Sequence, residues 1–373
     1  MSTTNAFEAD FDVLVAGGGP AGCATALALS RAGWRTAVVD RTRTVRASIG
    51  ESLPSAALPL LESLELHDAF AGAPHRRVRA NRSCWGQALP TERSALFAAH
   101  GEGWHLDRHH FDNMLRVGAF AAGASFIDGR VRMVDTSHKS GLTVCIARGR
   151  RGDTTSTSLD VRTRSIVDAT GRNATVARQL GARLRRADKL VAVCTHSVIH
   201  PPLSAHDAVS FVEACADGWW YSAPLPNGPY TVQFLTRPEI WRAQPGLTER
   251  LGSAPHTSER VGALAPEAPT VVPAHSSCVS PCAGPGWVAV GDAAAACDPL
   301  AAGGLAMAMR SGLRAGHALA RWLLDGDSAD LERYTHMQET AFADYLAQRA
   351  RLYALERRWP RAPFWVGPFV LPR

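Results

Sequence analysis

Lysine is almost absent from this chain. Lys139 and Lys189 are the only two among 373 residues, so the formal net charge of +6 comes from arginine. A basic surface of this kind favours a negatively charged cofactor or an acidic substrate. The arginines form no long run and no recognition motif accompanies them, so the sequence does not predict binding to nucleic acid.

Long apolar runs and paired cysteines are also missing. No stretch has the roughly eighteen uninterrupted apolar residues that a membrane span needs. The first apolar run, from Val13, reads as a strand rather than a signal peptide, so we expect a cytoplasmic protein. His275, Cys278 and Cys282 lie close together without a fourth ligand at a usual zinc spacing. We therefore predict no metal site and eight free thiols, at Cys23, Cys84, Cys145, Cys194, Cys215, Cys278, Cys282 and Cys297.

The segment "DVLVAGGGPAGCATALALSRAGWRTAVVDR" predicts a strand, a glycine turn, a helix and a second strand. Gly17, Gly19 and Gly22 have the Gly-x-Gly-x-x-Gly spacing that lets a pyrophosphate approach the N-terminus of a helix. Asp40 ends the second strand about twenty residues later, where a carboxylate binds the adenosine ribose. The segment therefore predicts a dinucleotide site.

Two later segments repeat a strand followed by a glycine turn. They are "RSIVDATGRNATVARQLG" and "GWVAVGDAAAACDPLAAGGLAMAMRSG". A nicotinamide domain would instead be continuous and end after about 150 residues. In their order along the chain and in their residues, these segments and "WHLDRHHFDNML" resemble flavoprotein monooxygenases of the hydroxybenzoate hydroxylase type.

That resemblance implies FAD, with Asp292 on the ribityl chain and the helix from Gly303 directed at the flavin pyrimidine. The FAD contacts that we predict are Gly17, Gly19, Gly22, Asp40, Arg41, Arg108, Gly171, Asp292, Pro299, Gly303 and Gly304. The superfamily's Asp-Gly pair, which is tied to pyridine nucleotide use, is Thr170-Gly171 here. NAD(P)H therefore reduces the flavin either directly or through a partner flavin reductase.

The predicted fold class is α/β. A three-layer Rossmann-like FAD domain of the glutathione-reductase type is interleaved with an antiparallel-sheet substrate domain and followed by a C-terminal helical segment. We expect the FAD domain at 1–75, 105–186 and 281–325, the substrate domain at 76–104 and 187–280, and a helix and extended tail at 326–373. Tracts such as "KLVAVCTHSVI" and "YTVQFLT" alternate as strands do.

The tract "DGWWYSAPLPNG" resembles a signature of flavin-dependent halogenases, and "GESLP" resembles their loop beside the flavin ring. In those enzymes an essential lysine follows that loop by some twenty to thirty residues. The corresponding region, 67–87, contains no lysine, and a guanidinium is a far weaker nucleophile. The aromatic tract also departs, with Tyr221 and Ala223 in place of tryptophan and isoleucine. Chlorination is therefore disfavoured.

Five strings in order, "GESLP", "NRSCWG", "DGWWYSAPLPNG", "DATGRNA" and "LERRWPRAPFW", resemble tryptophan-modifying flavin monooxygenases. These include enzymes that mature tryptophylquinone oxidases and enzymes that hydroxylate a peptidyl tryptophan. The resemblance implies that dioxygen forms a flavin C4a-hydroperoxide, which an indole attacks in a dry pocket. We predict Glu51 and Ser52 as catalytic residues, with capping of the helix predicted in "PSAALPLLESL" as the alternative for either one. Stacking walls are predicted at Trp85, Trp219, Trp220 and Tyr221, with core packing as the alternative for these rings.

Other readings stay open. A halogenase, a flavin reductase of the geranylgeranyl reductase kind and a flavoprotein that only binds a partner share many of these motifs. The stretch 331–357 has helical spacing, and the prolines after it require an extended tail. That tail either docks against the flavin domain to finish its core, or acts as a substrate-side lid whose Arg358, Arg361 and Arg373 suit an acidic peptide or protein that carries a tryptophan.

Overall fold

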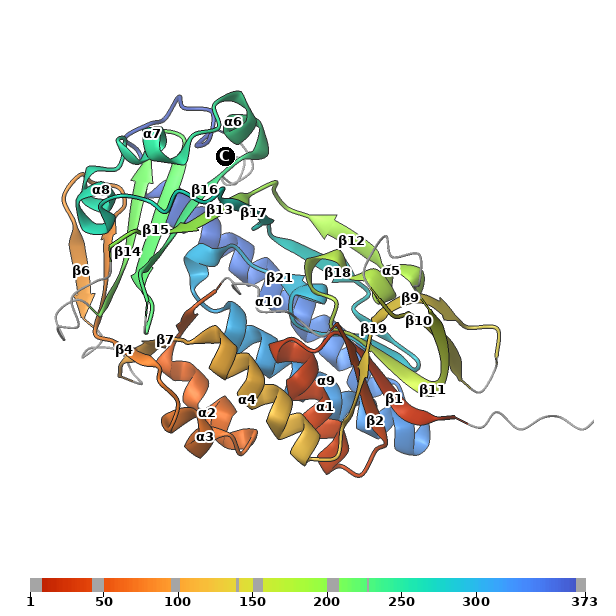
Figure 1. Cartoon of the computed structure of the whole chain (residues 1–373). Helices are drawn as coiled ribbons and strands as arrows, with labels where there is room; N and C mark the ends of the chain where they lie inside the picture. Colours follow the sequence, from red (N-terminus) through yellow and green to blue (C-terminus); the bar gives the residue numbers. More distant parts are fainter. Residues whose placement is uncertain are drawn as a thin grey trace, which may run out of the picture.

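The structure, a computed structural model, describes residues 9–41, 50–94, 101–138, 141–149, 157–199, 208–226 and 228–366. Within them the chain forms a large mixed sheet with helices on it, a second sheet at the other end, and two small sheets between (Figure 1). The predicted α/β fold is confirmed.

The first large sheet has a parallel centre. Its strands run in the order β19-β20-β11-β1-β2-β8, and β10 and β9 extend it from β11. Their bounds are β1 (Phe11–Ala16), β2 (Thr36–Asp40), β8 (Ser125–Asp128), β9 (Arg130–Asp135), β10 (Leu142–Ala147), β11 (Ser158–Asp168), β19 (Ala283–Gly284) and β20 (Trp287–Ala289). Val13 to Ala16 are fully buried, as expected for a central parallel strand covered on both faces.

Helices α1 (Pro20–Arg31), α4 (Arg108–Ala121) and α9 (Gly304–Asp325) cover one face of this sheet (Figure 1). α1 and α9 pack closely because α9 presents glycines to α1. A Cβ at Gly312 would lie 2.4 Å from the carbonyl oxygen of Ala21. Short helices nearby are α2 (Leu58–Ser63), α3 (His67–Ala71) and α5 (Thr175–Gln179), with 3₁₀ turns η1 (Ser55–Ala57), η3 (Gly171–Asn173), η5 (Gly291–Ala293) and η6 (Pro299–Ala301).

The second large sheet is mostly antiparallel and has seven strands in the order β17-β13-β16-β15-β14-β5-β6. They are β5 (Ala80–Cys84), β6 (Thr91–Ser94), β13 (Val191–His196), β14 (Val209–Cys215), β15 (Gly218–Pro224), β16 (Tyr230–Thr236) and β17 (Thr270–Pro273). Every residue of β16 is buried, so both faces of the sheet are covered. Helices α6 (Pro238–Ala243), α7 (Leu247–Leu251) and α8 (Pro255–Val261) lie at this end (Figure 1).

Two three-stranded sheets lie between the large ones. One consists of β3 (Ser52–Leu53), β7 (Gly103–His105) and β4 (Arg76–Val78). The other consists of β12 (Arg183–Arg186), β18 (Ser277–Ser280) and β21 (Ala295–Ala296). In the second sheet β18 pairs with strands from two of the three segments of the predicted FAD domain. The predicted boundary at 280 leaves β18 in the substrate domain although it pairs with β12 and β21, and the division into domains stays a prediction.

The chain ends in α10 (Ala329–Ala354) and a tail described to Val366. The helix matches the predicted one. The tail packs on the seven-stranded sheet, where the Trp365 indole donates to the Cys215 carbonyl at 2.9 Å and Phe364 is fully buried. It therefore completes the core of the substrate side, not of the FAD side as the core-packing alternative assumed. No helix in the described ranges is long and apolar enough to cross a bilayer.

Candidate active site

The glycine turn between β1 and α1 contains two glycines that close packing requires and one glycine that faces open space. A Cβ at Gly17 would lie 2.3 Å from the Ala169 carbonyl oxygen, and one at Gly22 would lie 1.9 Å from the Gly17 carbonyl oxygen. A Cβ at Gly19 would meet no atom within 4 Å. Gly19 therefore opens onto space beside the N-terminus of α1, where phosphates bind.

The other predicted FAD residues gather around this turn and the start of α9. The Asp40 carboxylate lies against Gly18, since a Cβ there would be 2.9 Å from Asp40 Oδ2. Arg41 follows on the surface. Gly303 is the N-cap residue of α9, and a Cβ at Gly304 would also meet no atom within 4 Å. This helix start, like that of α1, is open to an anionic group.

Asp292 in η5 forms an ion pair with a residue that the sequence reasoning missed. Arg172 Nε lies 3.3 Å from Asp292 Oδ2, and its guanidinium also donates to the carbonyls of His275 and Cys297. Arg172 directly follows the predicted Gly171, which has φ +73° in η3. Its place beside a predicted flavin contact was a usable signal.

The turn with the Thr170-Gly171 departure is ordered by Asp168 at the end of β11. Its carboxylate is buried and accepts from the amide and hydroxyl of Thr170 and from the amides of Val176 and Ala177. Thr170 Oγ1 in turn accepts from the Thr175 amide at 2.8 Å. Thr170 thus has a structural role at the start of α5.

Glu51 lies in a loop of the FAD side that reaches the seven-stranded sheet. Glu51 is only 6% exposed. Burial raises the pKa of its carboxyl, and the positive charge of Arg108 offsets part of that rise. Glu51 Oε2 accepts from the Gly50 amide at 3.2 Å and from Gln233 Nε2 at 3.3 Å. Arg108 Nη1 donates to the Gly50 carbonyl at 2.8 Å, so the predicted FAD contact also holds the Glu51 loop.

Three side chains form a row across the face of the seven-stranded sheet that Glu51 contacts. Tyr221 on β15, Gln233 on β16 and Cys194 on β13 are direct partners in the strand register and point the same way. We call them the polar row. Ser52 Oγ lies 2.7 Å from the Tyr221 hydroxyl, and burial together with the charge of Glu51 raises the pKa of that phenol. The catalytic candidates Glu51 and Ser52 thus both contact the polar row.

The two tryptophans before Tyr221 point to opposite faces of β15. Trp219 shares the face of the polar row, where its indole donates to the Tyr353 hydroxyl at 3.0 Å and it packs against Trp85. Trp220 is fully buried on the other face, packed on Phe234. Strand alternation therefore separates Trp220 from the polar row, and the core-packing alternative applies to it.

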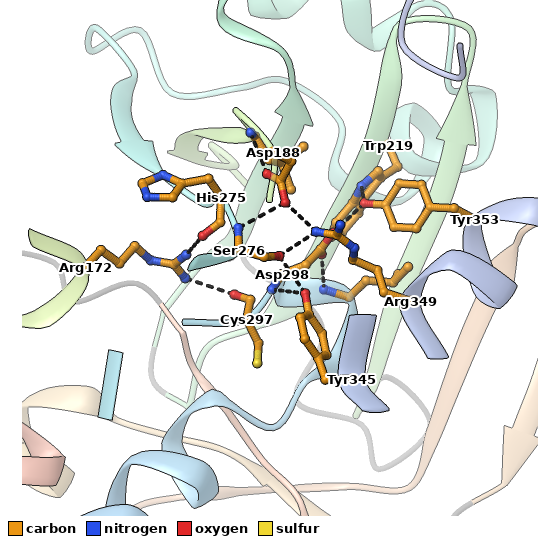
Figure 2. A network of polar contacts seen from close by, with 12 residues as sticks. Arg172, Asp188, Trp219, His275, Ser276, Cys297, Asp298, Tyr345, Arg349 and Tyr353 are labelled. Carbon is orange, nitrogen blue, oxygen red and sulfur yellow. Dashed lines mark hydrogen bonds and ion pairs between the residues drawn. The ribbon is translucent and has the colours of Figure 1, made fainter. Parts of the chain in front are cut away.

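A network of polar contacts adjoins the turn that leads into α9 (Figure 2). Asp298, the residue before Pro299, is 2% exposed, and burial raises its pKa to about 6. Its carboxylate accepts from the Tyr353 hydroxyl at 2.6 Å, and its amide donates to Tyr345 at 2.6 Å. Arg349 pairs with the buried Asp188. α10 therefore holds the turn that carries Pro299.

Comparison with known proteins identifies the cofactor. Residues 10–350 match the family model described as FAD binding domain. LodB of Marinomonas mediterranea, provisionally named an FAD-dependent oxidoreductase, is 28% identical over 369 residues, covering 95% of this chain and 96% of LodB. A Pseudomonas fluorescens chlorinase of 1H-pyrrole-2-carbonyl on a peptidyl-carrier protein is 26% identical, covering 90% and 79%.

Solved structures agree. The flavin-dependent halogenase CmlS superposes with a TM-score of 0.84 at 22% identity, covering 97% of this chain and 68% of CmlS. The peptidyl tryptophan dihydroxylase QhpG, essential for tryptophylquinone cofactor biogenesis, superposes with a TM-score of 0.76 at 25% identity, covering 96% and 79%. The open glycine positions fit the dinucleotide that these comparisons imply. The chain belongs to the FAD binding domain family and is a flavin-dependent oxidoreductase.

Proposed function

We propose that the protein is an FAD-dependent monooxygenase that hydroxylates an aromatic ring, and that this ring is a tryptophan held in a peptide or protein. The observation that carries the proposal is the contact of Glu51, which is only 6% exposed, with the polar row at the buried Gln233. NAD(P)H supplies the electrons, directly or through a flavin reductase. Bound FAD, once reduced, supplies the activated oxygen by reaction with dioxygen.

The residues around Glu51 suit an indole. A carboxylate accepts the indole N–H, which increases electron density on the ring, and the same group accepts the ring proton that leaves after oxygen has added. Gln233 and the Gly50 amide orient the carboxylate. Ser52 and Tyr221 provide hydroxyls on the same face. Exclusion of water around these groups protects an oxygen-transfer reaction from side products.

No described lysine lies at this site. Lys189 is on the surface, 79% exposed and 3.8 Å from Glu239, and Lys139 lies outside the described residues. Three of the four arginines of 67–87 are engaged elsewhere: Arg77 stacks on Trp104, while Arg79 and Arg82 face glutamates at 3.9 and 2.6 Å. These contacts support oxygen transfer to carbon over a lysine-dependent halogen transfer.

Halogenation is the second candidate because relatives such as the chlorinase carry that activity in their names. A macromolecular substrate is supported by two comparisons: that chlorinase is named for a carrier-protein-bound pyrrole, and QhpG for a peptidyl tryptophan. The arginines of the tail give weaker support for a macromolecular substrate. Arg358 pairs with Glu356 at 2.6 Å and Arg361 is exposed, while Arg373 lies outside the described residues.

The test supplies the FAD-loaded protein with NAD(P)H, a flavin reductase, labelled dioxygen and chloride or bromide. We expect one or two labelled oxygen atoms on a tryptophan-containing peptide, and incorporation at least about a hundredfold slower when the Glu51→Gln variant replaces the parent enzyme. Reaction without the added reductase would show direct reduction. A halogenated product would overturn the proposal in favour of the second candidate. Faster turnover of free tryptophan than of the peptide, at equal concentration, would reject the peptide substrate.

A further inference from the structure

Beside the polar network lies a continuous series of aromatic rings. The Trp85 ring centroid is 6.2 Å from that of Trp219 and 5.5 Å from that of Tyr353. Trp85 and Trp365 are 5.5 Å apart, and Trp365 and Trp359 are 6.4 Å apart and nearly parallel. Four of the ten tryptophans of the chain thus belong to one series of ring contacts, which also includes Tyr353.

The series has an inner and an outer end. Tyr353 and Trp219 are fully buried, and the Tyr353 hydroxyl donates to Asp298 beside the turn that leads into α9 (Figure 2). Trp85 and Trp359 are partly exposed, and Trp359 lies in the tail. The rings therefore lead from the predicted flavin side of the molecule to its surface.

We propose that Tyr353, Trp219, Trp85, Trp365 and Trp359 form a radical-transfer chain that carries a one-electron oxidising equivalent from the flavin side to the surface. The inference rests on the proposed oxygen chemistry: without substrate, dioxygen is reduced to hydrogen peroxide, and one further electron from the reduced cofactor splits the peroxide into hydroxide and a hydroxyl radical. Such a chain removes the oxidant from the buried site before it damages the residues there.

The contacts of each ring suit transfer rather than packing alone. A phenol is oxidised readily only if its proton has an acceptor, and the Asp298 carboxylate accepts it at 2.6 Å. An oxidised indole holds its N–H proton weakly, so a hydrogen-bond acceptor favours it. The Trp219, Trp85 and Trp365 indoles donate to Tyr353, to the Leu352 carbonyl and to the Cys215 carbonyl. Buried Trp220, outside the series, has no such acceptor among the described residues.

At the outer end Arg358 lies over Trp359, 4.3 Å from the ring centroid. A lone cation there would oppose oxidation of the ring. Glu356 neutralises it, because its carboxylate accepts from the backbone amide, Nε and Nη2 of Arg358. Trp359 therefore sits beside a neutral pair.

The transfer balances as follows. A hydroxyl radical takes one electron from Tyr353, whose proton passes to Asp298, and with a solvent proton it becomes water. An electron then moves inward from Trp219, Trp85, Trp365 and Trp359 in turn, and the proton returns from Asp298 to Tyr353. A soluble thiol reduces the oxidised Trp359, losing one electron and one proton to give a thiyl radical. The net reaction is hydroxyl radical plus thiol to water plus thiyl radical.

Flash excitation of the oxidised, FAD-loaded protein under argon tests the chain without dioxygen, because excited flavin takes one electron from nearby tyrosine or tryptophan. We expect a long-lived indole radical, seen by transient absorption and electron paramagnetic resonance, that glutathione quenches. Trp85→Phe should lose this long-lived signal. Trp220→Phe, the matched control on the opposite face of β15, should keep it.

An unchanged radical yield and lifetime in Trp85→Phe would overturn the chain, and so would an equal loss in Trp220→Phe. A second variant, Trp359→Phe, keeps the test valid if Trp85→Phe misfolds. Trp359→Phe should still form the radical, but glutathione should no longer quench that radical. Unchanged quenching would again overturn the chain. Oxygen uptake by the reduced protein is measured separately. Its absence would reject the proposed monooxygenase, while the flash experiment still decides the chain.

Discussion

In a Gly19→Val variant we expect the apo protein to fold as the parent does and to lose affinity for FAD. Gly19 has φ −77° and ψ −176°, an extended conformation open to any residue, and an added Cβ would meet no atom within 4 Å. Valine in place of glycine before a helix costs the fold about 1 kcal/mol or less. The added methyl groups instead occupy the space that the pyrophosphate needs.

Overpacking of a formed site costs about 1–3 kcal/mol. In binding this corresponds to a rise in the Kd for FAD of about five- to 150-fold. The matched comparison is Gly22→Ala, where the added Cβ would lie 1.9 Å from the Gly17 carbonyl oxygen. There the backbone must move, so we expect the apo protein itself to lose stability.

Two measurements on each purified variant separate the cases: fluorescence titration with FAD and thermal unfolding of the apo form. Gly19→Val should change the first and hardly the second, whereas Gly22→Ala should change both. The reasoning is refuted if Gly19→Val binds FAD with the parental affinity. It is also refuted if Gly19→Val unfolds the apo protein as readily as Gly22→Ala does.

Three further substitutions probe the site. Glu51→Gln should lower kcat/KM about 10²- to 10⁴-fold and abolish the rise of kcat/KM with pH. Steady-state rates between pH 5 and 9 measure this. Parallel pH profiles of the variant and the parent would contradict a role of Glu51 as a base. Because the folded-state pKa of Asp298 rises from 3.8 to about 6, its contribution to stability is present below pH 3.8 and lost by about pH 6, a change of about 3 kcal/mol. Asp298→Asn should therefore gain stability relative to the parent as the pH rises from 4 to 7, and denaturant unfolding that shows a constant difference would reject this. Tyr221→Phe removes the partner of Ser52 and should reduce turnover while FAD affinity stays unchanged; loss of FAD binding instead would place Tyr221 in the cofactor site.

Local patterns in the sequence were enough for the parts of the fold that depend on neighbours along the chain. The glycine spacing with Asp40 predicts the first strand, turn and helix, and the apolar spacing at 331–357 predicts α10, found at Ala329–Ala354. Both are periodic signals within a few turns or strands. The FAD cofactor followed because its contacts are carried by such local motifs.

Tertiary structure alone decided which side chains meet. Glu51 and Gln233 are 182 positions apart, and Asp298 and Tyr353 are 55 apart, so no spacing rule connects them. Alternation along a strand puts Trp219 and Tyr221 on one face and Trp220 on the other, but only the assembled sheet decided which of the two faces meets Glu51. The prolines required an extended tail but did not identify its partner, because the surface that the tail covers is assembled from β14 and β5, which come together only when the sheet forms.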